Sequence, residues 1–560
     1  MVALLLAGAL IAGCQSRTNV SATGSTPAQY THVFLTVRQV WFNPSATATA
    51  TDGSWTKFTL TAPQTLDLVS LNNGTLGQFA SQIKLAPGTY NQVRLILADS
   101  TDPLTTSAQT LGAASNDEVD YIDTMDLPHA VPLAIVNAAQ GISLNSSFTV
   151  AAATTSSGFG ITTTTTSTSS AAGSIGGSTF SAPVSSTTSA LIDFDASRDL
   201  VPISLSGQPA YVLNPHPHLY NEKDAGSIQG AVGLTNVSTL SPAALPDVQV
   251  SAESVSSDGS RHLIIKSTRV ATDGSFILYP LSTASGAPGS YDLVIHGPTI
   301  QTVIIKSVPV TAGAPGTTAV LGTLALTSAT PFGVNVNPSA PVAPTSSVIG
   351  FYQTLPLASE VPYLVEERAV DPISGVFATD QSLSGGSLQY GTFVSGGTIS
   401  LTTTTPTQGA GTYSIGLINP AYGTAALGTA VSAPGGNTTA LFSTAAPALP
   451  ANTTANGFTG NVSVAHVGTY DSAELFLTYN GALVATAPLQ AYLSGSPNTL
   501  TLNAVAPGGS ATASDAAGVY NAEVWAWNST NPTATLVRTP LASSIDLSQG
   551  NASAVTVNIP

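Results

Sequence analysis

Charge is what this chain of 560 residues has least of, since Asp, Glu, Lys and Arg make up only 8% of it. The 13 basic residues are outnumbered by 29 acidic ones, which gives a formal net charge of −16. So few cations cannot form the basic patch that neutralises phosphates, so nucleic acid is excluded as a partner. Ser, Thr, Asn, Gly and Ala must cover the surface instead, as they do in many secreted bacterial β proteins.

Cysteine is nearly absent, because Cys14 is the only one, and no disulfide can form within the chain. Residues 1–14 read as an apolar secretion signal, and its last four residues, IAGC, resemble the bacterial lipobox. That resemblance implies cleavage before Cys14 and a diacylglycerol on its thiol. Gln15 follows where inner-membrane retention usually shows Asp, which implies an outer-membrane anchor facing the periplasm or the outside. The alternative is an ordinary buried cysteine.

Helical periodicity is scarce as well, and the chain alternates apolar and polar residues, for example over 33–37 and 93–97. Such a period of two is typical of half-buried strands. One short helix is predicted over 76–83, where apolar residues recur at i, i+3, i+4 and i+7. Apolar residues make up 43% of the chain, enough for several cores. The predicted fold is all-β, with tandem β-sandwich modules, short turns and little helix.

A Gly-x-Tyr motif recurs before four alternating strands, and its spacing predicts four modules. It resembles a tyrosine corner, in which the ring packs and the hydroxyl binds nearby backbone. The alternative is a set of tyrosines that line a sugar site. The tyrosines of the four motifs are Tyr90, Tyr291, Tyr413 and Tyr520.

Domain boundaries follow shifts in composition. Residues 15–28 are polar and read as a tether that holds the first domain off the membrane. A Ser/Thr-rich stretch, 152–190, reads as an insertion within the first domain, and the Pro-rich stretch 329–346 reads as a linker. The predicted domains are an N-terminal β domain over 29–222, a β-sandwich over 223–328, a third β module over 347–440 and a C-terminal β module over 455–560.

Two segments resemble known families. THVFLTVRQVWF, TLDLVSL and APGTYNQVRLIL within 30–98, and LIDFDASRDLV within 190–215, resemble bacterial lipoproteins with the domain of unknown function 4382. This implies an extracytoplasmic β domain and no activity. GSIQGAV, LPDVQVSAES, TDGSF and PGSYDLVIHG within 226–327 resemble a carboxypeptidase-regulatory-like domain. That resemblance implies a transthyretin-like, seven-strand sandwich that serves as a spacer.

Three residues of the first domain form a candidate ligand face. Arg38 and Arg94 lie in mid-strand, opposite the apolar faces, and Trp41 is close to Arg38 in sequence. Arginine and tryptophan on one sheet face could grip a glycan or a carboxylate. The alternative is that each arginine pairs with a neighbour such as Asp67 or faces water.

Two candidate metal sites complete the search. The densest acidic run could bind Ca²⁺ through oxygen ligands, or it could be a solvated loop; it comprises Asp117, Glu118, Asp120, Asp123 and Asp126. His216 and His218 lie on one side of an extended segment and could begin a Zn²⁺ or Cu²⁺ site, or form part of a rigid connector.

No nucleophile elbow, metalloprotease motif or P-loop occurs in the sequence, so we expect no enzyme, no catalytic residue and no cofactor other than Ca²⁺. The predicted function is that of a lipid-anchored cell-envelope protein with a binding or structural role: adhesion, glycan contact or assembly with envelope proteins. The alternative is an accessory component of carbohydrate uptake or processing, and the third choice is a hydrolase with an unrecognised site.

Overall fold

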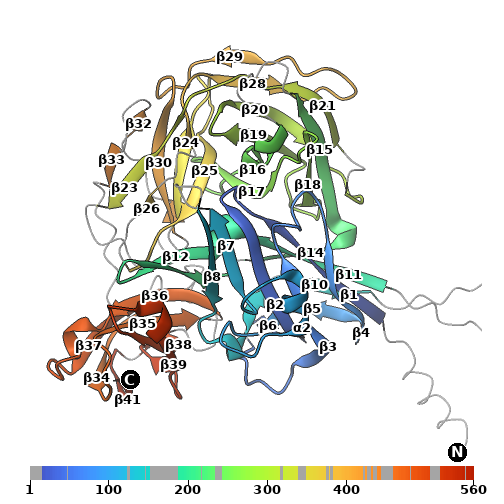
Figure 1. Ribbon diagram of the computed structural model, residues 1–560. Helices are drawn as coiled ribbons and strands as arrows, with labels where there is room; N and C mark the ends of the chain where they lie inside the picture. The colour runs from blue at the N-terminus through green and yellow to red at the C-terminus, as the bar shows by residue number, and fades with distance from the viewer. Residues whose placement is uncertain are drawn as a thin grey trace, which may run out of the picture.

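A computed structural model of the protein describes residues 16–46, 48–122, 127–144, 147–151, 187–215, 217–233, 242–315, 319–338, 348–373, 377–378, 383–419, 423–424, 430–432, 438–442, 458–479, 481–504, 518–548 and 550–560. Strands dominate these residues, which confirms the all-β class of sandwich modules (Figure 1). None of the helices in these ranges is long and apolar enough to cross a membrane. The α-helices are α2 (Thr106–Leu111), α3 (Ala196–Asp199) and α4 (Pro532–Thr535).

The first module packs an eight-stranded sheet, ordered β12-β13-β8-β7-β2-β6-β9 with β3 on β2, against a four-stranded sheet, β14-β11-β1-β4. A smaller pair, β5 and β10, accompanies them. Alternate residues of the strands, such as Val33, Val93 and Ile192, are fully buried in the shared core. The strands are β1 (Ser16–Ser25), β2 (Tyr30–Asn43), β3 (Thr56–Asp67), β4 (Gly77–Leu85), β5 (Gly88–Tyr90), β6 (Gln92–Leu97), β7 (Glu118–Ile122), β8 (Pro128–Ala134), β9 (Ile142–Leu144), β10 (Phe148–Val150), β11 (Thr187–Asp195), β12 (Leu200–Leu205), β13 (Gln208–Leu213) and β14 (His218–Asn221).

The polar tether predicted for 15–28 is wrong for Ser16–Ser25, which form β1. This strand runs parallel to β11 and antiparallel to β4, in the middle of the four-stranded sheet. Apart from Arg17 and Asn19 its side chains are short, and Val20 and Ala22 are fully buried. A run of Ser, Thr, Ala and Val fits a pleated sheet as well as it fits a linker, so composition could not separate the two.

The helix predicted over 76–83 is wrong too, because this segment is strand β4. The pairing of β4 with β1 shifts register between Thr18 and Val20, and Gln82 has a φ of 56°. Such a bulge adds a residue to one strand and turns side chains to the other face. Phe79, Ala80 and Ile83 are therefore all buried at spacings that imitate a helix.

The second module is a sandwich of seven strands in two sheets. One sheet has the order β18-β15-β21, and the other contains β17-β16-β19-β20. The second sheet does not end there, because β28 pairs in parallel with β20 and β29 follows it. The strands are β15 (Ala225–Gly233), β16 (Gln249–Val255), β17 (His262–Arg269), β18 (Ser275–Ser282), β19 (Ser290–Gly297), β20 (Ile300–Pro309), β21 (Ala319–Ala325), β28 (Leu388–Thr392) and β29 (Thr402–Thr404).

The third module therefore continues a sheet of the second. Its own core includes Val294 and Ile304 from the second module. Residues predicted as a linker, 329–346, contain strands β22 and β23, so that prediction is wrong for them. The remaining strands are β22 (Pro331–Phe332), β23 (Val334–Pro338), β24 (Val348–Gln353), β25 (Tyr363–Ala369), β26 (Phe377–Ala378), β27 (Leu383–Ser384), β30 (Thr412–Asn419), β31 (Gly423–Thr424), β32 (Ala430–Ser432) and β33 (Thr438–Phe442).

The fourth module is a separate sandwich that lies beside the first (Figure 1). A three-stranded sheet, β37-β34-β41, packs on a five-stranded sheet, β36-β35-β38-β39 with β40 on β38. The strands are β34 (Phe458–His466), β35 (Ser472–Tyr479), β36 (Ala482–Pro488), β37 (Thr499–Ala504), β38 (Val519–Trp527), β39 (Val537–Pro540), β40 (Ile545–Asp546) and β41 (Ala552–Ile559).

The recurrent tyrosines are structural. The rings of all four are buried, which leaves no open face for a sugar. In three of them the tyrosine hydroxyl donates a hydrogen bond to a backbone carbonyl. Tyr90 donates to Ala86 at 3.0 Å, Tyr291 to Ser282 at 3.1 Å and Tyr413 to Ser384 at 2.7 Å. These bonds confirm the predicted tyrosine-corner role at three of the four motifs.

Candidate functional site

Two of the three residues of the predicted ligand face do come together. Strand pairing places Trp41 directly opposite Arg94 on β2 and β6. The ring of Trp55 packs against Trp41 with centroids 5.8 Å apart, and the guanidinium of Arg94 lies 5.4 Å from the Trp55 ring. The Nζ of Lys57 lies over Trp41, 3.8 Å from the centroid of its ring. The indoles and Arg94 are thus buried against one another, while Lys57 is exposed above Trp41.

Arg94 is far more buried than the sequence led us to expect. Only 2% of it is exposed, and burial lowers its pKa to about 10. Its Nη1 donates to the carbonyl of Gln140 at 2.6 Å. Its Nε and Nη2 have no hydrogen-bond partner among the described residues. Burying a guanidinium with two unpaired donors costs free energy of folding. Arg94 is therefore the strongest candidate in the first module for a site that binds an anionic ligand.

Arg38 does not join that cluster. A register shift between Val37 and Gln39 lifts it out of the β2–β6 ladder. Its guanidinium pairs with Asp102 at 2.9 Å, while Asp67, the partner offered from sequence, binds His32 Nδ1 at 2.9 Å. Both members of the Arg38 pair are about one-third exposed, which makes it a surface ion pair.

The acidic run is not a solvated loop where the structure describes it. Burial raises the pKa of Asp117, whose Oδ1 accepts the N–H of Thr36 at 2.8 Å. Glu118 is buried too and accepts the N–H groups of Ala114 at 2.9 Å and Ser115 at 2.8 Å. Burial, and then the neighbouring Glu118, raises the pKa of Asp120 to about 6. These carboxylates serve the fold of this loop.

The metal predictions remain open. Asp123, Asp126 and His216 lie outside the described residues, as does Cys14. Within the described ranges, no group of three or more His, Cys, Asp or Glu side chains could hold a metal ion. His218 lies at the start of β14, and its ring is 6.4 Å from that of Tyr220.

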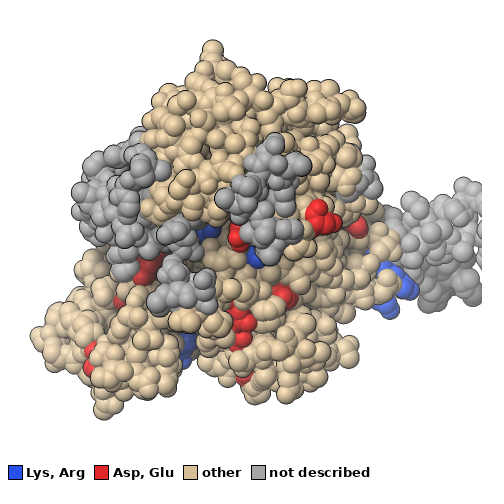
Figure 2. Space-filling view, turned by 45° about the horizontal axis from the view of Figure 1, so that its top comes forward, with Lys and Arg blue, Asp and Glu red and all other residues tan. Residues whose placement is uncertain are grey.

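Sequence reasoning missed the most elaborate polar sites, which lie where one module meets another. We call these the joints and name each by its two modules. Seven of the 13 basic residues make joint contacts: Arg198, Arg261, Lys266, Arg269, Lys306, Arg368 and Arg538. The face in Figure 2, by contrast, shows large areas without any charged atom.

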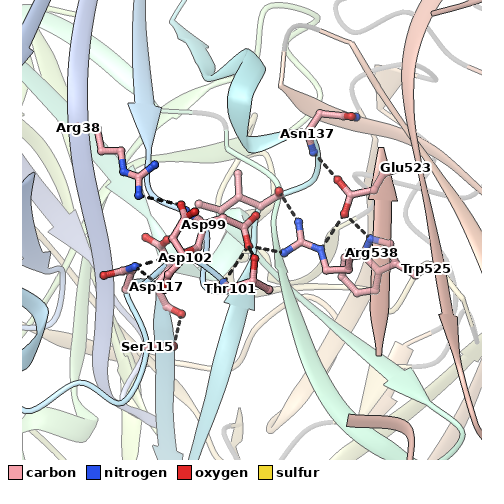
Figure 3. Close-up of polar contacts among 12 residues, drawn as sticks. Arg38, Asp99, Thr101, Asp102, Ser115, Asp117, Asn137, Glu523, Trp525 and Arg538 are labelled. Atoms are coloured by element: carbon pink, nitrogen blue, oxygen red, sulfur yellow. Dashed lines mark hydrogen bonds and ion pairs between the residues drawn. The ribbon is translucent and has the colours of Figure 1, made fainter. Parts of the chain in front are cut away.

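At the first–fourth joint, Arg538 of β39 binds both modules (Figure 3). Its Nε donates to Glu523 at 2.7 Å, its Nη1 to Asp99 of the first module at 3.0 Å, and its Nη2 to the carbonyl of Ile135 at 2.7 Å. The side chains of Arg538 and Glu523 are 9% and 3% exposed. The cation is therefore enclosed, and each of its three nitrogens donates a hydrogen bond.

Glu523 completes this network. It accepts the indole N–H of Trp525 at 2.9 Å and the backbone N–H of Asn137, in the first module, at 2.8 Å. Beside the ions lies an apolar cluster that draws on both modules, and the guanidinium of Arg538 is 5.2 Å from the ring centroid of one of its members, Trp525. The cluster includes Val136, Val201, Val212, Phe476, Leu483, Trp525 and Trp527.

The first–second joint centres on Lys266 of β17. Its Nζ lies 2.5 Å from Asp193 Oδ1 of β11, and the two side chains are only 1% and 4% exposed. Burial raises the pKa of Asp193 to about 7, against the opposing effect of Lys266. Nearby, Arg269 donates to the carbonyls of Thr26 and Tyr30, each at 2.7 Å.

The third module is joined to both earlier ones. Arg198 grips Glu367 with two bonds, Nε to Oε1 at 2.6 Å and Nη2 to Oε2 at 3.0 Å, and its Nη2 also reaches the carbonyl of Ile264 at 3.3 Å. Arg368 donates to Gln29 at 3.0 Å. The charged residues interrupt apolar strands, as in HLIIKSTR and YLVEERA. That was the signal available in the sequence, but it did not identify the partners.

Comparisons with known proteins add one family and no close relative. No curated protein matches the chain in sequence. A streptococcal ancillary pilin is 9% identical, covers 70% of this chain and 95% of its own, and has a TM-score of 0.11. The Corynebacterium diphtheriae major pilin SpaA is 10% identical, with coverages of 75% and 92% and a TM-score of 0.11. Such scores establish neither a common fold nor a function.

The family match concerns the first module. The sequence motifs that carry the resemblance lie within 30–98 and 190–215. The match covers these and also includes strand β1. Residues 16–215 match the family described as "Domain of unknown function (DUF4382)".

Proposed function

We propose that this chain is a lipid-anchored, non-catalytic structural protein of the bacterial outer membrane, whose four modules form one stiff body at the cell envelope. The observation that carries the proposal is the use of its scarce basic residues. Seven of the 13 contact another module. Except for Lys306, whose pair with Glu360 is partly exposed, they are shielded from water or engaged by several groups.

Such joints support rigidity over flexible linkage. Modules on flexible linkers need no buried charge between them, and inter-domain motion is the default when an interface is small. Removing one partner of a buried pair leaves an uncompensated charge, which costs about 3–5 kcal/mol. Each joint therefore resists partial opening. A stiff body that presents sandwich edges suits adhesion or assembly with other envelope proteins better than turnover of a substrate.

The anchor comes from the sequence. The lipobox resemblance at Cys14 implies a membrane-bound N-terminus, and β1 begins at Ser16. The first module would then sit close to the membrane rather than on a long tether. The resemblance of 226–327 to a carboxypeptidase-regulatory-like domain also supports a spacer role for the second module.

A fractionation experiment tests the anchor and the location together. The wild-type chain and the C14S variant are expressed in a Gram-negative host, and outer membranes are separated from soluble periplasm. The wild type is expected in the outer membrane and C14S outside it. Equal distribution of the two proteins would contradict the lipid anchor.

A binding role as an accessory in carbohydrate uptake is the second candidate, and Arg94 favours it. Two of its buried nitrogens lack partners within the described residues, and Trp55 lies beside it. A sugar carboxylate could satisfy both nitrogens. A glycan array that includes uronic acids should then show saturable binding that R94A abolishes and R38A keeps, because Arg38 already pairs with Asp102. Binding that survives R94A would reject this candidate.

A further inference from the structure

One joint contact has the geometry of a reacting pair. Lys266 Nζ and Asp193 Oδ1 are 2.5 Å apart, and both side chains are closed to water at 1% and 4% exposure. Strand β11 lies between β14 and β1, and β17, at the edge of its sheet, pairs with β16. Ser25 of β1, which pairs with β11, donates its hydroxyl to the carbonyl of Ser267 at 2.7 Å. The amine and the carboxyl are thus held in contact by two rigid sheets.

Other charged pairs differ in a way that matters. Arginine stays protonated, and its guanidinium does not act as a nucleophile, which sets Arg198 and Arg538 aside. Among the described residues, the other lysine pairs are open to water. Lys223 and Asp224 are 66% and 38% exposed, and Lys306 and Glu360 are 27% and 12% exposed. Within the described ranges, only Lys266 combines a nucleophilic amine with a carboxyl that is closed to water.

We infer that Lys266 and Asp193 condense to an amide, an isopeptide bond that covalently joins the first and second modules. The proton passes from Nζ to the carboxylate along their hydrogen bond, which leaves an amine and a carboxylic acid. The Nζ lone pair then attacks Cγ, an N–C bond forms and a C–O bond breaks. The departing hydroxyl takes a proton from the nitrogen and leaves as water. No oxidant or cofactor is needed.

The surroundings favour each step. Burial disfavours the charged forms, and it raises the pKa of Asp193 to about 7, so the carboxylic acid is accessible near neutral pH. Nζ also donates to the carbonyl of Gly24 at 3.3 Å, which orients the amine. Because the fold already holds the two groups in contact, the reaction avoids the entropy cost of bringing them together. Exclusion of water removes the reagent that would hydrolyse the product. The bond goes beyond the proposed function, since it would hold wherever the protein works.

Peptide mapping of the denatured full chain tests this directly. Trypsin should cut after Arg261, Lys266 and Arg269, and it should release Asp193 within the peptide Leu95–Arg198. An acylated Lys266 resists trypsin. We therefore expect one branched species, His262–Arg269 joined to Leu95–Arg198, lighter by one water than the sum of its parts. Recovery of free His262–Lys266 in full yield would overturn the inference.

Variants keep the test specific. K266R and D193A should both lose the branched species, and D193A should restore cleavage after Lys266. Circular dichroism reports whether each variant folds, but the wild-type result decides the question alone. Lys306 is the matched control, because its pair with Glu360 is wetter. A branched peptide at Lys306 as well would overturn the argument that burial selects Lys266.

Discussion

The interior of each module and the joints between modules solve different problems. Interiors are mainly apolar, with buried tyrosine hydroxyls bonded to backbone in three modules, although Arg94 and Asp117 are buried within the first module. Joints combine apolar side chains with enclosed ions, as around Arg538. Apolar contact is non-directional, whereas a buried ion pair is stable only in one geometry. The difference suggests that cores provide the stability of each sandwich and that joints select a single arrangement of the sandwiches.

The largest effect should follow R538A. This change leaves Glu523 buried without its cation and removes the bond to Asp99 across the first–fourth joint. We expect the free energy of unfolding to fall by about 3–5 kcal/mol, in the range for a broken buried pair. Urea unfolding followed by Trp fluorescence measures it. A loss below about 1 kcal/mol would place this joint among ordinary surface contacts.

Rising pH should destabilise the fold through Glu474 of β35, in the fourth module. Burial raises the pKa of this carboxyl to about 8, and Asp371 of the third module also raises it. The folded state then holds a proton that the unfolded state releases above about pH 4.5. The contribution of this proton to the free energy of unfolding is complete below that pH. It falls as pH rises toward 8, by up to about 1.4 kcal/mol per pH unit.

The control for this pH effect is E474Q, which cannot titrate. Its unfolding free energy should lose that pH dependence, while the wild type keeps it. If both proteins show the same slope between pH 5 and pH 8, Glu474 is not the group responsible.

Conservative substitutions sharpen the comparison between joint and core. R198K keeps the charge but loses the two-bond grip on Glu367, so we expect a cost of about 1–3 kcal/mol, because a buried charge is left poorly bonded. L293M, in the second module's core, conserves volume and should cost less than about 1.5 kcal/mol. Thermal unfolding of both variants measures the difference. A larger loss of stability for L293M than for R198K would contradict the view that joints depend on one exact geometry more than cores do.

The smallest effect is expected from R38A. The pair with Asp102 is exposed on both sides, at 38% and 33%. Exposed pairs contribute about 0–1 kcal/mol, and salt screens them. Unfolding in low and high salt should show a small loss that salt removes. A loss that matches R538A would mean that burial does not set the value of these ions.

Much of this organisation was readable from the sequence. Alternation predicted the strands that contain Val33 and Val93, and the Gly-x-Tyr motif predicted the buried tyrosines. Strand β1 was lost because its Ser and Thr residues suit a linker as well as a sheet. Strand β4 was lost because a bulge gave its apolar residues a helical spacing.

The joints could not be predicted in the same way. Lys266 and Asp193 are separated by 73 residues, and Arg538 and Asp99 by 439. No local pattern connects such partners, because their proximity depends on how whole sandwiches pack. Arg94 shows the same limit on a smaller scale, since only the fold over Trp41 and Trp55 buries it.

Calorimetric unfolding of the full chain tests most directly whether the joints make one body of the four modules. The wild type is compared with the double variant R198A/R538A, which removes ions from the first–third and first–fourth joints. We predict a single cooperative transition for the wild type and separate transitions for the double variant. Separate transitions already present in the wild type, at temperatures that the double variant leaves unchanged, would contradict the account.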